Sequence, residues 1–167
     1  AEVVTTRGDD IDQVRALVRD ADGLLANLNP VDAETIGAMG RCKVISRYGV
    51  GFDSVDVDAA TEAGIWVTNV PDYATEDVSD HAVALLLTCV RKIPFRDAGI
   101  RKGGWNLKNE QKSWRTADKT LGILGLGHIG SATARKLSGF GFSRVLACDP
   151  YIDASGFAKS NAQSVDF

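Results

Sequence analysis

The feature that most constrains this chain is the glycine run Gly125-Leu126-Gly127-His128-Ile129-Gly130. A short apolar run, Leu121–Leu124, precedes it and predicts a strand. Another apolar run, Arg144–Cys148, predicts a second strand that ends at Asp149, about 20 residues after the last glycine. Between them, apolar residues recur at helical spacing: Ile129, Ala132, Thr133, Leu137 and Phe140. Strand, glycine turn, helix, strand and acid in this order are typical of a dinucleotide-binding fingerprint.

Each position of this fingerprint has a physical role. Gly125 permits the tight turn, and Gly127 lets the backbone approach a pyrophosphate because no Cβ stands in the way. Gly130 lets the helix pack closely on the strand. Asp149 can accept hydrogen bonds from ribose hydroxyls, and its charge would repel the 2′-phosphate of NADP. The pattern therefore predicts NAD as the cofactor, and the alternative is a structural glycine turn with a capping Asp.

The composition is that of a globular chain, since 44% of its 167 residues are hydrophobic and 25% are charged. The net charge of −3 favours neither nucleic acid nor an anionic membrane as a partner. No apolar run is long enough to span a bilayer and no signal peptide is visible. Because the chain starts at Ala1 rather than at a methionine, we expect part of the N-terminus to be missing.

The three cysteines, Cys42, Cys89 and Cys148, are widely spaced and embedded in apolar runs. An odd number without a Cys-x-x-Cys pair argues against a disulfide framework and against a zinc site. We therefore expect buried, reduced thiols in a cytoplasmic protein, and no metal.

Strands and helices alternate along the first part of the chain. Strands are predicted at Gly23–Ala26, Cys42–Ser46 and Ile65–Thr68, and a further short strand is possible at Ala1–Thr6. Helices are predicted at Gly8–Ala21, Asp32–Met39 and Asp56–Ala63, and Gly64 stops the last of them. This alternation predicts a parallel sheet with right-handed crossovers. The pattern breaks at Asn69–Asp72, which predicts one domain over residues 1–72 and a second over 73–167.

The most apolar segment is a helix predicted over about Thr75–Ile93, with Thr75 as its N-cap and Pro94 as its stop. Its apolar residues extend beyond a single stripe, so we expect it to be buried against more than one neighbour. A further helix is predicted at Phe95–Arg101, before a polar stretch over Gly103–Lys119.

A second glycine loop, Arg47–Asp53, follows the strand Cys42–Ser46. Ligands of open α/β sheets bind at the carboxyl ends of strands. The N–H groups of Val50 and Gly51 could hold a carboxylate there, because little side chain stands in the way. The alternative is a tight turn in which Asp53 and Asp56 make local caps.

Two stretches, Ser46–Pro94 and Thr120–Tyr151, resemble the D-isomer-specific 2-hydroxyacid dehydrogenases, and Arg101–Trp105 resembles the segment that links them in that family. The form NVPDYATEDVSDHAVALLL looks closest to the branch that includes the C-terminal binding proteins, corepressors that keep a dehydrogenase fold. The resemblance implies an α/β fold with a flavodoxin-like lid domain plus the first part of a Rossmann doubly wound parallel sheet, and a cofactor cleft between the two domains.

The resemblance also implies roles for individual residues. The Val50-Gly51 backbone would hold the substrate carboxylate, and Val50 would lie near the nicotinamide. Asp80-His81 occupies the Glu-His position of the family and is interpreted as structural. Thr75 would contact the cofactor through its hydroxyl, and the alternative is an N-cap role. His128 and Ile129 would bind the pyrophosphate through their backbone N–H groups, and Asp149 would bind the adenosine ribose.

In this family an arginine grips the substrate carboxylate and a histidine–glutamate pair acts as acid and base. The resemblance places all three beyond Phe167, and we expect neither His81 nor His128, the two histidines of the chain, to act as the base. We therefore expect a fragment of a cytoplasmic, homodimeric, NAD-dependent enzyme that transfers hydride between nicotinamide and C2 of a small D-2-hydroxy or 2-oxo acid. The identity of the acid stays open, and a phosphoglycerate-type substrate is one possibility. The alternative to an enzyme is an NAD(H)-sensing, corepressor-like regulatory module.

Overall fold

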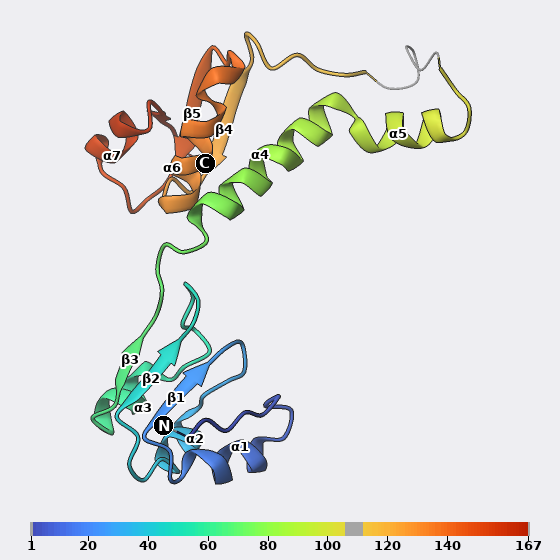
Figure 1. Cartoon of the computed structure of the whole chain (residues 1–167). Coiled ribbons are helices and arrows are strands. Elements are labelled where there is room, and N and C mark those ends of the chain that lie inside the picture. The colour runs from blue at the N-terminus through green and yellow to red at the C-terminus, as the bar shows by residue number, and fades with distance from the viewer. Residues whose placement is uncertain (1, 106–111, 167) are drawn as a thin grey trace. The chain divides into compact units, whose positions relative to one another are not determined.

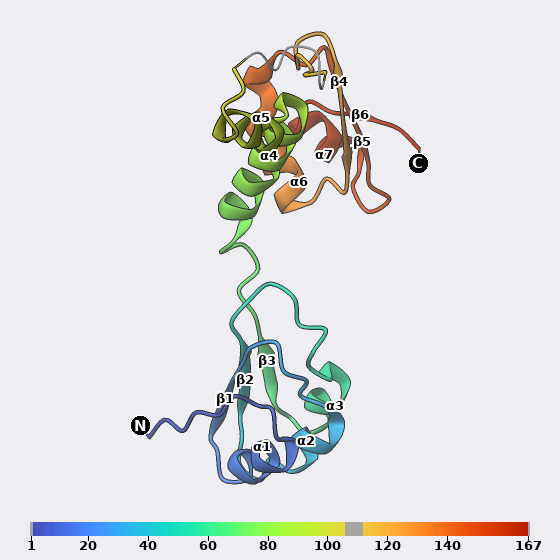
Figure 2. The ribbon, with the colours of Figure 1, turned by 90° about the vertical axis from the view of Figure 1, so that its right-hand side faces the viewer.

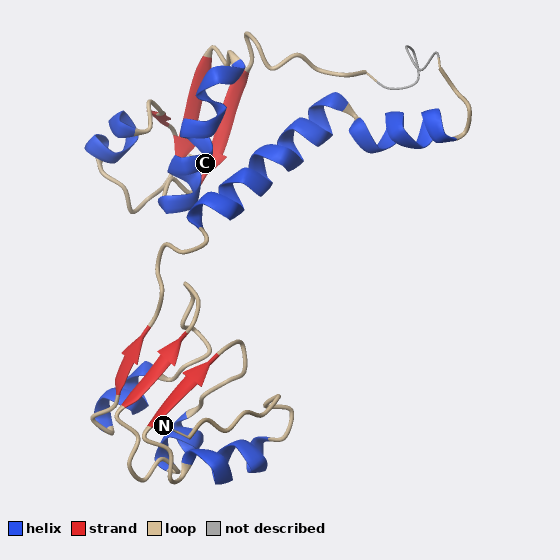
Figure 3. Cartoon of the chain, in the orientation of Figure 1, coloured by secondary structure: helices blue, strands red, loops and turns tan. Residues whose placement is uncertain are grey.

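A computed structural model describes residues 2–105 and 112–166. The chain divides into two compact units, Ala1–Tyr73 and Ala74–Phe167. Each unit contains a three-stranded parallel sheet with helices beside it (Figures 1 and 3). The α/β fold with parallel sheets is therefore confirmed.

The first unit is built on strands in the order β1-β2-β3. Its elements are α1 (Ile11–Val18), β1 (Gly23–Ala26), α2 (Ala33–Gly37), β2 (Val44–Arg47), α3 (Val57–Glu62) and β3 (Trp66–Thr68). Leu24, Ile45 and Val67 are register partners across the sheet. These three side chains belong to the core, together with Ile36 of α2 and Ala60 of α3.

Aspartates begin all three helices of this unit. Asp10, Asp32 and Asp56 accept hydrogen bonds from backbone N–H groups of the first turns of α1, α2 and α3. The hydrogen bonds from Thr35 hold the pKa of Asp32 below its usual value of 3.8, with help from Arg15. Gly64 follows α3 with a φ of 70°, as predicted for the residue that stops this helix.

The short strand considered at Ala1–Thr6 does not form. Residues 2–6 pair with no strand in the described ranges, and both Val3 and Val4 are exposed. An isolated strand has no partner for its backbone groups and no surface against which to bury its valines, so propensity alone does not stabilise it.

The second unit contains the strands β4 (Thr120–Leu124), β5 (Arg144–Cys148) and β6 (Gln163–Ser164) in that order. This is the 3-2-1 half of a Rossmann sheet, with β4 as its first strand. The helix α6 (His128–Leu137) and a short turn, η1 (Ser138–Phe140), connect β4 to β5, and α7 (Ala154–Lys159) connects β5 to β6. Leu126, Ala147 and Phe157 form the buried centre of this unit.

The two helices predicted over Thr75–Ile93 and Phe95–Arg101 are present as α4 (Thr75–Arg91) and α5 (Ile93–Arg101), but the break between them comes earlier than predicted. It lies at Lys92, which adopts a left-handed conformation with φ of 58°. Pro94 therefore lies in the first turn of α5 and does not stop α4. Thr75 is not the N-cap either, since Ala74 occupies that position and no side chain caps the helix.

The expectation that α4 is buried against more than one neighbour is also wrong for the described part of the chain. Its only buried residue is Ser79, and Leu85 is 52% exposed. The helix lies along α6, and Figure 2 shows the two helices from a second side. One neighbouring helix covers one stripe of a helix, so the remaining apolar side chains stay in contact with solvent.

Three further predictions concern cysteines, metals and membranes. Cys42 is buried, Cys148 is half-buried and Cys89 is exposed, so the expectation of buried thiols fails for Cys89, which lies on the uncovered part of α4. All three thiols are free. Among residues 2–105 and 112–166, no cluster of side chains suits a metal ion, and no helix combines the length and apolar character of a membrane span.

Candidate functional site

The fingerprint forms a loop between β4 and α6, at the carboxyl end of the second sheet. Gly125 has a φ of 83°, a backbone conformation that favours glycine, which confirms its role in the turn. At Gly130 a Cβ would collide with the carbonyl oxygen of Gly125. The close approach of α6 to this turn thus depends on glycine at that position, as predicted.

The backbone N–H groups at the start of α6 are available for a ligand. Those of His128 and Ile129 donate to no acceptor in the described ranges, and the N-cap, Gly127, offers no side chain. No Cβ clash is found at Gly127, so the space around it is open. Free N–H groups and the positive end of the helix dipole form a site for an anion such as a phosphate.

Asp149 lies beside this loop at the end of β5. Its Oδ2 accepts a hydrogen bond from the N–H of Leu126 at 2.7 Å, and its Oδ1 accepts one from the N–H of Tyr151 at 2.9 Å. A carboxylate can accept about four hydrogen bonds, so Asp149 keeps lone pairs for hydroxyl groups of a ligand. The sequence predicted the position of this acid but not its bond to the loop.

A second side chain, that of Ser131, also holds this loop. The hydroxyl of Ser131 donates to the carbonyl oxygen of Leu126 at 2.7 Å, and the hydroxyl of Ser160 donates to that of Ser131 at 3.1 Å. The sequence did not predict these hydrogen bonds, because Ser160 lies far from Ser131 along the chain and only the fold brings the two hydroxyl groups together. The loop is thereby connected to α6 and to the end of α7.

Charged residues fasten α4 to α6. Glu76 pairs with Arg135 at 2.6 Å and with Lys136 at 3.0 Å, and Asp80 pairs with Lys136 at 2.6 Å. Hydrogen bonds from Lys136 and Arg135 lower the pKa of Glu76. Burial of Lys136 opposes its charge, but its bonds to Asp80 and Glu76 raise its pKa overall.

Two other residues of α4 that the sequence singled out, Thr75 and His81, are not among those that form these ion pairs. Thr75 is half-buried at the start of α4, and its hydroxyl makes no hydrogen bond with a described residue. His81 is exposed, although it was expected to lie on a packed helix. No acidic side chain among the described residues pairs with it, and that His81 is not the base stays a prediction.

In the first unit, the glycine loop at the end of β2 presents two free donors. The N–H groups of Val50 and Gly51 have no acceptor in the part of the chain that the structure describes. The loop is fixed on its other side, since the amide of Asn69 donates to the Val50 carbonyl at 2.8 Å. Asp56 caps α3, as the alternative interpretation expected, but Asp53 only lies beside Gly51.

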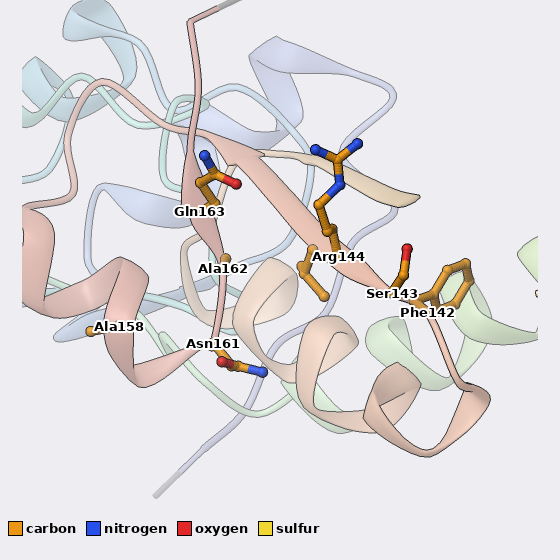
Figure 4. Close-up of a pocket in the computed structure, with 8 residues that line it drawn as sticks. Phe142, Ser143, Arg144, Ala158, Asn161, Ala162 and Gln163 are labelled. Carbon is orange, nitrogen blue, oxygen red and sulfur yellow. The ribbon is translucent and has the colours of Figure 1, made fainter. Parts of the chain in front are cut away.

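A hollow of about 480 Å³ lies at the other end of the second sheet. Figure 4 shows that its lining comes from the start of β5, from α7 and from the segment that leads into β6. Because ligands of such sheets bind at the carboxyl ends of the strands, we assign no function to this hollow.

The arrangement was compared with known proteins. The profile described as "D-isomer specific 2-hydroxyacid dehydrogenase, catalytic domain" matches residues 1–164. The chain belongs to this family. The resemblance seen in its two glycine-containing stretches is thus confirmed at the level of the family.

The chain is similar to dehydrogenases and reductases of several kinds. It is 40% identical to a D-3-phosphoglycerate dehydrogenase of Mycobacterium bovis over 159 residues, which are 95% of this chain and 30% of that protein. It is 40% identical to a glyoxylate reductase of Korarchaeum cryptofilum over 136 residues, which are 79% of this chain and 41% of the relative.

Among solved structures, it matches a D-lactate dehydrogenase of Aquifex aeolicus complexed with NAD and lactic acid. The TM-score is 0.81 and the identity 28%, over 90% of this chain and 45% of that one. The chain thus spans between about a third and a half of the length of these three proteins.

Proposed function

We propose that the whole protein is an NAD-dependent oxidoreductase that acts on a small D-2-hydroxy or 2-oxo acid. The observation that carries this proposal is the fingerprint loop: the N–H groups of His128 and Ile129 have no acceptor among the described residues, the space at Gly127 is open, and the Asp149 carboxylate binds the loop at Leu126. The similarity to a D-lactate dehydrogenase complexed with NAD and lactic acid supports it.

The cofactor would be held mainly by backbone groups. Gly125, Gly127 and Gly130 shape the loop, and the N–H groups of His128 and Ile129 bind the pyrophosphate. Asp149 binds the adenosine ribose, and its charge disfavours the extra phosphate of NADP. Thr75 contacts the cofactor through its free hydroxyl. When bound, the nicotinamide exchanges a hydride with C2 of the acid.

The substrate would be held by the first unit. The free N–H groups of Val50 and Gly51 would bind its carboxylate. The arginine and the histidine–glutamate pair of the family are proposed to lie beyond Phe167, in the whole protein. The three free cysteines fit a reducing compartment, so we place the protein in the cytoplasm.

Two measurements test this function. In the first, the chain is titrated into NADH and the fluorescence of NADH is followed. We expect the wild type to bind NADH and Gly130→Ala to lose this binding, because the new Cβ would collide with the Gly125 carbonyl. NADH consumption by the whole protein is then measured with glyoxylate, pyruvate, hydroxypyruvate and phosphohydroxypyruvate. Turnover supports the enzyme, whereas NADH binding without turnover by the whole protein would favour the NAD(H)-sensing module. Absence of NADH binding would contradict both.

A further inference from the structure

Leu126, within the glycine loop, has its two backbone polar groups held by the two ends of one connection, the segment from the end of β5 through α7. Asp149, at the start of this segment, accepts a hydrogen bond from the Leu126 N–H. Ser160, at its end, reaches the Leu126 carbonyl through Ser131. Leu126 is 1% exposed, so water does not replace these partners. The connection from β5 through α7 therefore determines how the loop is oriented at this residue.

The two serines form a chain of hydrogen bonds whose direction is fixed. Each hydroxyl has a single proton, and a carbonyl oxygen can only accept. Ser131 donates its proton to the Leu126 carbonyl at 2.7 Å, so its oxygen accepts the proton of Ser160 at 3.1 Å. Because hydrogen bonds in a chain polarise one another, the bond from Ser160 strengthens the bond from Ser131 to the carbonyl.

The carbonyl of Leu126 controls the direction of a donor in the candidate phosphate site. It shares a planar, trans peptide group with the N–H of Gly127, and in such a group the C=O and the N–H point in opposite directions. The Gly127 N–H has no acceptor among residues 2–105 and 112–166, and the space at Gly127 is open. The bond from Ser131 therefore directs this N–H to the side of the peptide away from Ser131.

This peptide group needs a restraint from outside, because glycine at position 127 lacks the Cβ that limits φ in other residues. The carbonyl bond from Ser131 supplies the restraint. Ser160 is itself fixed in place, since its N–H donates to carbonyl oxygens of α7 and Phe157 of this helix belongs to the same buried cluster as Leu126. The chain of hydroxyl groups thus connects the loop to a packed helix.

We propose that Ser160 is a positioning residue for the dinucleotide, acting through Ser131 to hold the Gly127 N–H toward a phosphate. This inference rests on the proposed function, in which the loop binds the pyrophosphate of NAD. A donor that is oriented before the ligand arrives does not have to be ordered on binding, and this lowers the free-energy cost of binding. The two hydroxyl groups therefore contribute to cofactor affinity and not to hydride transfer.

The dissociation constant of NADH, measured by fluorescence titration of the whole protein, tests the proposal. We expect Ser160→Ala to raise it about 3- to 10-fold, the range of one neutral hydrogen bond, and Ser131→Ala to raise it at least as much. If Ser160 acts through Ser131, the double variant should bind NADH as tightly as Ser131→Ala alone. Ser160→Thr keeps the hydroxyl group and should restore most of the affinity.

Two further readouts separate positioning from a merely structural role. With the best of the four 2-oxo acids as substrate, Ser160→Ala should raise KM for NADH and leave kcat at saturating NADH nearly unchanged. Without NADH, its midpoint of thermal unfolding should stay close to that of the wild type, since Ser131 still satisfies the buried carbonyl. Ser155→Ala is the matched control, because it removes another serine hydroxyl of α7, an exposed one bonded to Asp153. It should change neither the affinity nor KM.

Losses of affinity that add in the double variant would overturn the proposal, since Ser160 would then act independently of Ser131. A Ser160→Ala protein that binds NADH like the wild type would also overturn it. If weaker binding came with a lower unfolding midpoint and a lower kcat, the bond would have a structural role only. These three results leave the proposed function intact, because the wild type still binds NADH, whereas absence of NADH binding by the wild type would contradict the proposed function itself.

Discussion

At Leu126, both backbone polar groups are held by side chains, the N–H by Asp149 and the carbonyl by Ser131. Leu126 is almost fully buried, so these bonds satisfy groups that water does not reach. The neighbouring N–H groups of His128 and Ile129 have no acceptor among residues 2–105 and 112–166. Asp149 therefore has two roles in our proposal, since it orders the phosphate-binding loop and also selects the cofactor.

Asp149→Asn separates these two roles. An amide oxygen can still accept the bond from Leu126, whereas the charge that repels a 2′-phosphate is gone. We expect the preference for NADH over NADPH to decrease by about tenfold or more, the scale of one hydrogen bond to a charged group. Fluorescence titration with both cofactors measures the ratio. Asp153→Asn, at the N-cap of α7, is the control, and a ratio that stays constant in Asp149→Asn would speak against the ribose role.

At the scale of the elements, α4 is fastened to α6 by Glu76 and Asp80 on one side and Arg135 and Lys136 on the other. These contacts are made by long, largely exposed side chains, except for Lys136, which is mostly buried. Ionised carboxylates thus contribute to holding α4 against α6, and the stability of this helix pair should respond to acid.

The sign of this response follows from the pKa of Glu76, which is lower in the folded protein than its ordinary value of 4.5. The contribution of Glu76 is present above that value and is lost as the pH falls through the folded pKa. We expect Glu76→Gln to lower the unfolding midpoint slightly at pH 7 and to match the wild type in strong acid. Chemical denaturation from pH 7 to pH 3 checks this. Asp77→Asn, for which the described residues show no ion pair, is the control and should have no such effect on stability. If Glu76→Gln were less stable than the wild type by the same amount at every pH, the role of the ionised Glu76 carboxylate would be contradicted.

At the scale of the whole molecule, each unit has its own buried core, while the helices α4 and α5 keep apolar side chains exposed. These exposed side chains are Val78, Leu85, Ile93 and Ile100. Several exposed apolar side chains on neighbouring helices are typical of an interaction site. We propose that a second copy of the protein covers α4 and α5, which would make the homodimer that the family resemblance implies.

Leu85→Glu tests this proposal in the whole protein. A charge placed in an apolar interface is costly, so we expect the dimer to dissociate to monomers at concentrations at which the wild type stays associated. Size-exclusion chromatography with light scattering measures the mass. Leu28→Glu, at a more exposed leucine of the first unit, should leave the mass unchanged. A Leu85→Glu protein with the wild-type mass would place the interface elsewhere.

Most elements could be predicted from the sequence, because local rules govern them. The spacing of apolar residues located five of the six strands, and aspartates and Gly64 located helix ends. The sequence also pointed to the fingerprint, since the conformation of Gly125 and the small size of Gly130 are requirements of a single turn. The break between α4 and α5 was predicted slightly too late, at Pro94, because Lys92 is not a residue that usually adopts a left-handed conformation.

By itself, then, the sequence determined the parallel α/β units, the position of the glycine turn that we propose binds phosphate, and the family. Tertiary structure alone decided which side chains are covered: α4, predicted to be buried, is largely exposed, and Arg47, a charged residue, is buried. It also decided that Asp149 reaches Leu126 and that Ser160 reaches Ser131. The physical reason is that turns and caps depend on neighbours along the chain, whereas burial and long-range hydrogen bonds depend on neighbours that only folding brings together.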